Sequence, residues 1–257
     1  LGSGVTASIA RSIGEKNKFN ADRSASHAIL IAGVISFIFT IAGIIYGESI
    51  LIILGAEGEI LSLGYEYLSS IVIGLPFMVF SGFFRSILAG EGDMKFPMMI
   101  AGLGTILNII LDPIFIFDLD NYWNLGLGLG VKGAALATVI SQLTVFIIFT
   151  YMLFIKKHAY ISFNFKNFRV SNQIFMGIIR VGLPASLSMI IMAIGQGVFN
   201  KILIHYSPQT VAAYQVAGRL DMLIFLPIFA LAGAMTTLVG MFYGAKKFVD
   251  LNYIVIY

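Results

Sequence analysis

Six predominantly apolar stretches constrain the fold of this chain more than any other feature of its sequence. They cover residues 28–54, 66–90, 97–117, 133–155, 174–204 and 210–243. Stretches of roughly 20 or more apolar residues cross the hydrocarbon layer of a membrane as α-helices. Hydrophobic residues make up 58% of the chain and charged residues only 11%, which is too little polar surface for a water-soluble globule. We therefore predict an all-α fold, a polytopic membrane helical bundle.

The connections between these stretches alternate in charge. Lys and Arg are concentrated in residues 9–24, 85–97, 155–170 and 244–248, whereas the intervening connections hold only Lys132, with Lys201 at an adjoining helix end. Cytoplasmic loops of membrane proteins carry the excess of Lys and Arg. We therefore place the four basic segments in the cytoplasm and predict a multi-pass protein of the cell (plasma) membrane.

The residue counts exclude several kinds of functional site, and the two ends of the sequence indicate how much of the protein it covers. The chain contains no cysteine, so a disulfide, a thiolate metal site or a cysteine nucleophile is excluded, and a net charge of +3 argues against binding of nucleic acid. Residue 1 is Leu, residues 1–13 resemble the tail of an earlier apolar stretch, and residues 251–257 resemble the start of a later one. We expect the chain to be an internal fragment of a longer protein.

Two segments that lie 230 residues apart are either an internal repeat or a chance similarity, since only four of their sixteen low-complexity positions are identical. LGSGVTASIARSIGEK from Leu1 aligns with LAGAMTTLVGMFYGAK from Leu231, and both copies end in a glycine, Gly14 or Gly244, followed by a basic turn. Both copies leave the membrane on the same predicted side. A parallel repeat, with its axis along the membrane normal, requires this arrangement.

Five segments together resemble the multidrug and toxic compound extrusion (MATE) transporters, whose superfamily includes polysaccharide-precursor exporters and lipid II flippases. They are RSILAGEGDMKFPMM (85–99), GTILNIILDPIFIF (104–117), GVKGAALATVISQ (130–142), GLPASLSMI (182–190) and LVGMFYGA (238–245). The resemblance implies part of a twelve-helix transporter with two lobes. Residues 1–155 would form the N-terminal lobe from the end of helix 2 to helix 6, residues 156–172 the cytoplasmic linker, and residues 173–257 the start of the C-terminal lobe, with helices 7 and 8 and the beginning of helix 9.

Asn108 and Asp112 stand out because they lie inside an apolar stretch. Their spacing of four residues places them on one helix face, where they can share a ligand. A charge at membrane depth costs about 2.5 kcal/mol or more and is rarely kept without a partner or a watery cavity. Because burial favours the neutral acid, we expect Asp112 to exchange a proton in use and, when charged, to hold Na⁺ or a cationic substrate.

Pro113 follows Asp112 directly and cannot donate a hydrogen bond to the carbonyl of Ile109, so we predict a helix bend and a free carbonyl beside the carboxylate. The family resemblance also implies that Asn108 and Asp112 form a cation-coupling site. The alternative is that Asp112 only ends its helix and meets interfacial water.

Other polar residues in the apolar stretches have two interpretations each. They can line a transport cavity, or they can serve packing: close approach of small residues around Thr138, hydrogen bonds between helices for the amides, and a structural ion pair for the charged residues. These candidates are Thr138, Gln142, Gln196, Asn200, Arg219 and Asp221.

The favoured function is a secondary active exporter, an antiporter for multidrug or xenobiotic export of amphiphilic, cationic organic compounds, driven by a proton or sodium gradient. We expect no cofactor apart from the coupling ion, and we expect small-molecule substrates, membrane lipids and a monomeric state. One alternative is a flippase for lipid-linked saccharides, for whose pyrophosphate only Arg219 and Arg180 are candidates. A membrane-embedded enzyme is a remote alternative, since His-Glu-x-x-His and Gly-x-Ser-x-Gly motifs are absent.

Overall fold

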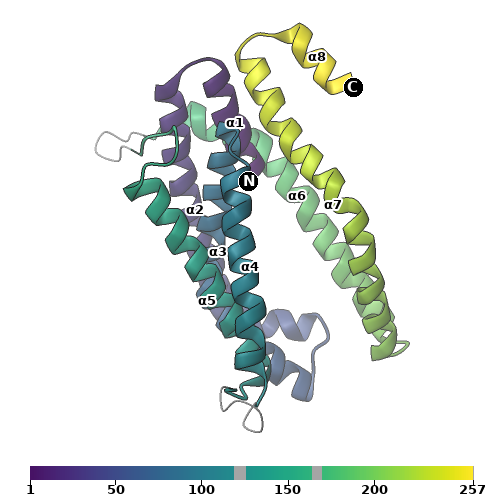
Figure 1. Ribbon diagram of the computed structural model, residues 1–257. Coiled ribbons are helices and arrows are strands. Elements are labelled where there is room, and N and C mark those ends of the chain that lie inside the picture. Colours follow the sequence, from purple (N-terminus) through teal and green to yellow (C-terminus); the bar gives the residue numbers. More distant parts are fainter. Residues whose placement is uncertain (119–125, 164–169, 257) are drawn as a thin grey trace. The chain divides into compact units, whose positions relative to one another are not determined.

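A computed structural model describes residues 1–118, 126–163 and 170–256. Every regular element in these three ranges is a helix (Figure 1). The helices are α1 (Gly2–Gly14), α2 (Lys18–Ile53), α3 (Gly58–Glu91), α4 (Lys95–Ile116), α5 (Gly130–Thr150) with its π-helical continuation η1 (Tyr151–Ile155), α6 (Asn172–Ile204), α7 (Pro208–Gly244) and α8 (Phe248–Ile256). Helices satisfy their own backbone hydrogen bonds, which a chain in lipid requires.

Six of the described helices are long and apolar enough to cross a membrane, and they coincide with the six predicted stretches. The all-α, multi-pass prediction is therefore confirmed. The boundaries differ most in α2, which begins at Lys18, ten residues before the predicted start at residue 28. Asn17 caps this earlier start, because its Oδ1 accepts the backbone N–H of Asn20 at 3.0 Å. Hydropathy reveals only the part of a helix that contacts lipid, not the polar turns that extend beyond it.

The described chain divides into two compact units. Within the described residues, the first contains Leu1–Ala25, Ala89–Gly92 and 170–256, and the second contains Ser26–Leu88, 93–118 and 126–163. The lobe boundaries given above, 1–155, 156–172 and 173–257, remain a prediction. Residues 164–169 of the predicted linker lie outside the described residues.

In the second unit, α4 and α5 approach closely at two glycines. A side chain on Gly104 would overlap Val145 Cγ2, and one on Gly133 would overlap the Phe115 carbonyl oxygen. The two helices can approach this closely only because glycine has no Cβ, and such close approach is typical of helix pairs in membranes. The two contacts hold α4 and α5 together above and below the polar residues between them.

In the first unit, α1 and α7 make a reciprocal contact through the two repeated glycines. A Cβ on Gly14 would overlap the Met241 carbonyl oxygen, and a Cβ on Gly244 would overlap the Arg11 carbonyl oxygen. Gly14 corresponds to Gly244, and Arg11 to Met241, at the same offset of 230 residues. Each copy thus touches its counterpart with the same surface, as a local two-fold relation requires.

The turns that follow these two helices repeat each other hydrogen bond for hydrogen bond. After α1, Lys16 N–H donates to Ile13 O and Asn17 N–H to Ser12 O, both at 2.9 Å. After α7, the N–H groups of Lys246 and Lys247 donate to the carbonyls of Tyr243 (3.1 Å) and Phe242 (3.0 Å). Lys16 and Lys246 both have a positive φ, 55° and 58°, which completes a Schellman ending in each copy. The structure thus confirms the internal repeat.

Candidate functional site

The second unit contains a cavity of about 330 Å³ between α3, α4 and α5, here called the α4–α5 cavity. Polar groups dominate its wall, although all three helices belong to the apolar stretches. Its lining residues are Arg85 from α3, Ala101, Gly104, Thr105 and Asn108 from α4, and Thr138, Ser141, Gln142 and Val145 from α5. A polar cavity at membrane depth holds water or a ligand, because its groups find no partners in lipid.

Asn108 and Asp112 are joined as their spacing predicted. The Asn108 Nδ2 donates to Asp112 Oδ1 at 3.1 Å, and both side chains are half-buried. Asn108 also lines the α4–α5 cavity, whereas Asp112 is not part of its wall. The carboxylate is therefore linked to the cavity through the amide. Its free oxygen lone pairs remain acceptors for a proton or a cation.

Asp112 does not end its helix. α4 continues through Pro113 to Ile116, four residues or about 6 Å beyond Asp112 at the usual helical rise. Because Pro113 has no N–H, the carbonyl of Ile109 keeps a free lone pair one turn away. Carboxylate, amide and carbonyl oxygens are ligands for hard cations, and these three groups belong to Asp112, Asn108 and Ile109. The described residues contain no group of three or more His, Cys, Asp or Glu side chains that could hold a metal ion. A site for Na⁺ at Asp112 therefore remains a prediction that relies on amide and carbonyl oxygens.

On α5, Thr138 and Gln142 both face the cavity together with Ser141. The Thr138 hydroxyl donates to the Ala134 carbonyl at 3.0 Å, which leaves its oxygen as an acceptor. Ser141 is almost fully buried, and its hydroxyl has no hydrogen-bond partner among the described residues. Such a buried hydroxyl is normally satisfied by ordered water or a ligand.

Two uncharged polar lining residues, Thr105 and Ser141, were missed by the sequence interpretation. Thr105 lies three residues before Asn108, and Ser141 lies three residues after Thr138. Each extends a polar stripe at helical spacing, so a search for i, i+3 and i+4 neighbours would have found both.

Arg85 belongs to one of the four basic segments that the charge pattern assigned to the cytoplasm. The structure places it inside α3, six residues before the end at Glu91, with its side chain lining the same cavity as Asn108. It makes no ion pair with any described residue. A positive charge on the wall of this cavity attracts anions and repels cations.

The candidates on α6 and α7 belong to the first unit and do not form one cluster within the described chain. Asn200 accepts a hydrogen bond from Gln215 Nε2 at 3.2 Å, so this amide links α6 to α7. Gln196, Arg219 and Asp221 are exposed, and no described residue pairs with either charged side chain. Their predicted role in lining a cavity remains a prediction.

Comparison with known proteins identifies the relatives of this chain. The MatE family model matches residues 1–114 and 184–257. The chain is 31% identical to the probable multidrug resistance protein NorM of Thermotoga maritima over 94% of its own length and 51% of that protein. It therefore spans about half the length of the curated relatives it matches.

Solved structures give the same result. A transporter of the MOP superfamily from Pyrococcus furiosus, described as having a binding pocket whose reverse polarity suggests a different function, matches with a TM-score of 0.90 and 35% identity. The match covers all of this chain and 55% of that one. A second structure, a MATE protein in complex with MaD3S, matches with a TM-score of 0.89 and 35% identity over all of this chain and 56% of the other.

Proposed function

Because the chain belongs to the MATE family of multi-pass membrane transporters, we propose that the whole protein is a secondary active exporter. It exchanges amphiphilic organic cations for protons or sodium ions. Because this family consists of transporters, the alternative of a membrane-embedded enzyme is dropped. The observation that carries the proposal is the Asn108–Asp112 hydrogen bond beside the polar α4–α5 cavity.

The site supports exchange because Asp112 can exist in two charge states with different partners. As a carboxylate it accepts the Asn108 amide and attracts a cation. Once protonated, it offers an O–H donor and no longer holds a positive charge. A proton or sodium ion and a cationic substrate therefore compete for the same group, directly or through helix movement at Pro113.

The α4–α5 cavity supplies the water that such exchange needs. Its wall offers hydrogen-bond donors and acceptors from Arg85, Thr105, Ser141 and Gln142. The Ser141 hydroxyl has no hydrogen-bond partner among the described residues. Ions cross an apolar region only along polar groups or water. We expect the cavity to hydrate the coupling ion as it reaches or leaves Asn108.

Transport in vesicles tests this proposal. Whole protein is reconstituted into liposomes, a fluorescent lipophilic cation is added, and its movement is followed after a proton or sodium gradient is imposed. Asp112→Asn should reduce gradient-driven transport to the level of protein-free vesicles, and any dye binding that remains should no longer depend on pH or on the sodium concentration.

The matched control is Asp118→Asn, since Asp118 is a carboxylate two residues beyond α4 and is exposed. This variant should transport like the parent. If Asp112→Asn keeps its gradient dependence, or if Asp118→Asn loses it equally, Asp112 is not the coupling group.

Arg85 favours a second candidate, an exporter of compounds that carry a phosphate, such as lipid-linked saccharides. The sequence offered only Arg219 and Arg180 for that role, and the structure adds one arginine on the cavity wall. Arg85→Gln separates the two candidates. Transport of a cationic dye should persist or rise in this variant if the first candidate is right, and flipping of a labelled lipid-linked saccharide should cease if the second is right.

A further inference from the structure

A second polar cavity lies in the first unit, at the end of the molecule that the charge pattern places in the cytoplasm. It has a volume of about 230 Å³ and is formed by α1, the start of α2 and the start of α6. We call it the arginine–serine cavity. Its lining residues are Ser8, Arg11, Ser12, Glu15, Asn20, Arg23, Ser24, Ser171, Gln173, Ile174 and Gly177. It is separate from the residues to which transport was assigned above.

The internal repeat shows that these polar side chains are not needed to build the turn. The α7–α8 turn has the same backbone hydrogen bonds and the same positive φ. It nevertheless has apolar or small residues at the positions equivalent to the cavity residues of α1: Leu238 for Ser8, Met241 for Arg11, Phe242 for Ser12 and Ala245 for Glu15. Since the same turn occurs with either set, its backbone geometry does not explain the polar side chains of the first copy.

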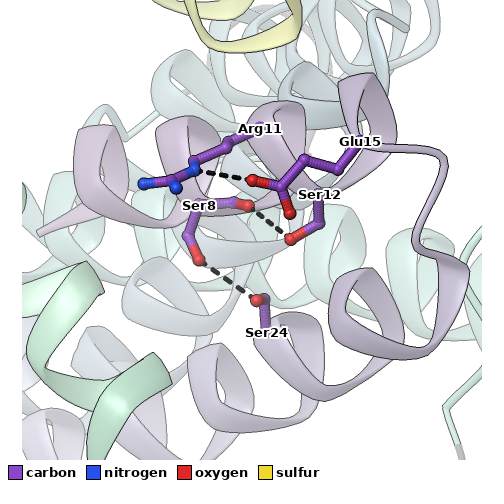
Figure 2. A network of polar contacts seen from close by, with 5 residues as sticks. All are labelled: Ser8, Arg11, Ser12, Glu15 and Ser24. Atoms are coloured by element: carbon purple, nitrogen blue, oxygen red, sulfur yellow. Dashed lines mark hydrogen bonds and ion pairs between the residues drawn. The ribbon is translucent and has the colours of Figure 1, made fainter. Parts of the chain in front are cut away.

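The polar cluster has more donors than the described chain uses (Figure 2). Arg11 donates from Nε to Glu15 Oε1 at 2.9 Å, and no described residue accepts from its two Nη atoms. The hydroxyls of Ser8 and Ser24 share one hydrogen bond of 3.1 Å. That bond uses one of the two hydroxyl protons and leaves the other available. Unused donors of this kind suit an acceptor-rich ligand.

Two further features favour an anion. Two arginines and one glutamate leave the cavity lining with one net positive charge. The first turn of α6 also contributes Gln173 and Ile174, and no side chain caps the start of that helix. The N–H groups of a first helical turn have no acceptor within their own helix and attract negative charge.

We propose that the arginine–serine cavity binds a phosphate group. Phosphate offers several acceptor oxygens in a geometry that matches the planar guanidinium fork, and Arg11 has both Nη atoms available for it. The volume of about 230 Å³ corresponds to about eight waters at ~30 Å³ each, which is enough for one phosphate group with bound water. The phosphate is either the headgroup of an anionic membrane lipid or part of a soluble compound.

Glu15 gives the proposal a distinctive consequence. Its carboxylate pairs with Arg11, and both side chains are partly exposed to solvent, at 35% and 58%. An exposed ion pair of this kind is weak, so a phosphate can replace it on the guanidinium. Removing the competing carboxylate should therefore strengthen phosphate binding, which a variant that merely unfolds cannot do.

The experiment uses the whole purified protein in a zwitterionic detergent and measures its thermal unfolding midpoint in two titrations. One adds short-chain phosphatidylglycerol, and the other adds inorganic phosphate or glycerol 3-phosphate, with chloride at equal ionic strength as the reference. A rise in the midpoint with the lipid alone identifies a headgroup site, and a rise with the soluble phosphates identifies a soluble ligand. No rise in either titration overturns the proposal.

Four variants complete the test. Arg11→Gln and Arg23→Gln should each weaken binding about tenfold or more, as expected for loss of charge-assisted hydrogen bonds, and Glu15→Gln should strengthen it about threefold through relief of competition. Lys246→Gln is the matched control, because it removes a positive charge from the equivalent turn, outside the cavity. Weakening by Lys246→Gln as large as that by the arginine variants would mean non-specific attraction and would overturn the proposal. The test does not depend on the exporter function, since it measures no transport.

Discussion

The α1–α2 turn and the α7–α8 turn have the same backbone hydrogen bonds but differ in most of the side chains around them. Both end in a glycine that touches the carbonyl of the other helix, and both continue through a lysine with positive φ. Around this shared backbone, the first copy has the arginine–serine cavity, whereas the second copy has the apolar side chains of Met241 and Phe242 at the positions of Arg11 and Ser12. The comparison separates what the contact between the copies requires from what each copy adds.

The two glycines give the strongest way to break the comparison. Gly14→Ala and Gly244→Ala should each lower stability by about 1–3 kcal/mol, because the new methyl group would overlap a backbone carbonyl that cannot rotate away. The thermal unfolding midpoint of the whole protein in detergent measures this effect. Gly233→Ala on the same helix is the control, since no described atom lies within 4 Å of its added Cβ. A large loss from only one of the two glycines would refute the reciprocal contact.

A hydrogen bond that exists in only one copy gives the next effect. The buried Thr237 hydroxyl donates to the Ala89 carbonyl at 2.9 Å, and its counterpart, Ala7, has no hydroxyl. Thr237→Val should lower stability by about 1 kcal/mol, because it removes this bond and keeps the shape. Thr236→Val is the control, since the Thr236 hydroxyl is exposed and bonds only within its own helix. Equal unfolding midpoints for the two variants would show that the Ala89 bond adds nothing.

Exchange of a side chain between the copies tests whether the polar set is dispensable for folding. Arg11→Met introduces the residue that the second copy has at this position. It removes an exposed ion pair and a contact of Arg11 with the Tyr243 ring at 5.2 Å, so the cost should not exceed about 1 kcal/mol. A much larger fall in the unfolding midpoint would mean that the first turn does depend on its polar residues.

The smallest effect concerns the two lysines with positive φ. Lys16→Gly and Lys246→Gly should each raise stability by up to about 0.5 kcal/mol, because glycine adopts this conformation without strain but loses more entropy on folding. Lys247→Gly, one residue later, should lower the unfolding midpoint, since no positive φ is relieved there. Opposite signs at Lys16 and Lys246 would show that the two turns are not equivalent in energy.

The candidate site was predictable where its geometry lies within one helix. A spacing of four residues joined Asn108 to Asp112, and the same spacing put Thr138 and Gln142 on one wall. The position of Arg85 was not predictable, because a residue near a helix end reads as part of a loop when only charge and hydropathy are considered. Arg219 and Asp221 share a helix that is exposed in the described chain, so no local rule could assign their partners.

The sequence alone determines the helical fold, the six apolar helices and the pairing of Asn108 with Asp112. They depend on the apolar length and on the fixed rise and rotation per residue of an α-helix, which are local properties. Only the tertiary structure showed that Gly14 and Gly244 face each other's helices, and that serines and arginines of α1 and α2 surround one cavity with the start of α6. Contacts between residues far apart in sequence depend on which helix faces can approach, and in lipid that is decided by shape and by the absence of a single Cβ.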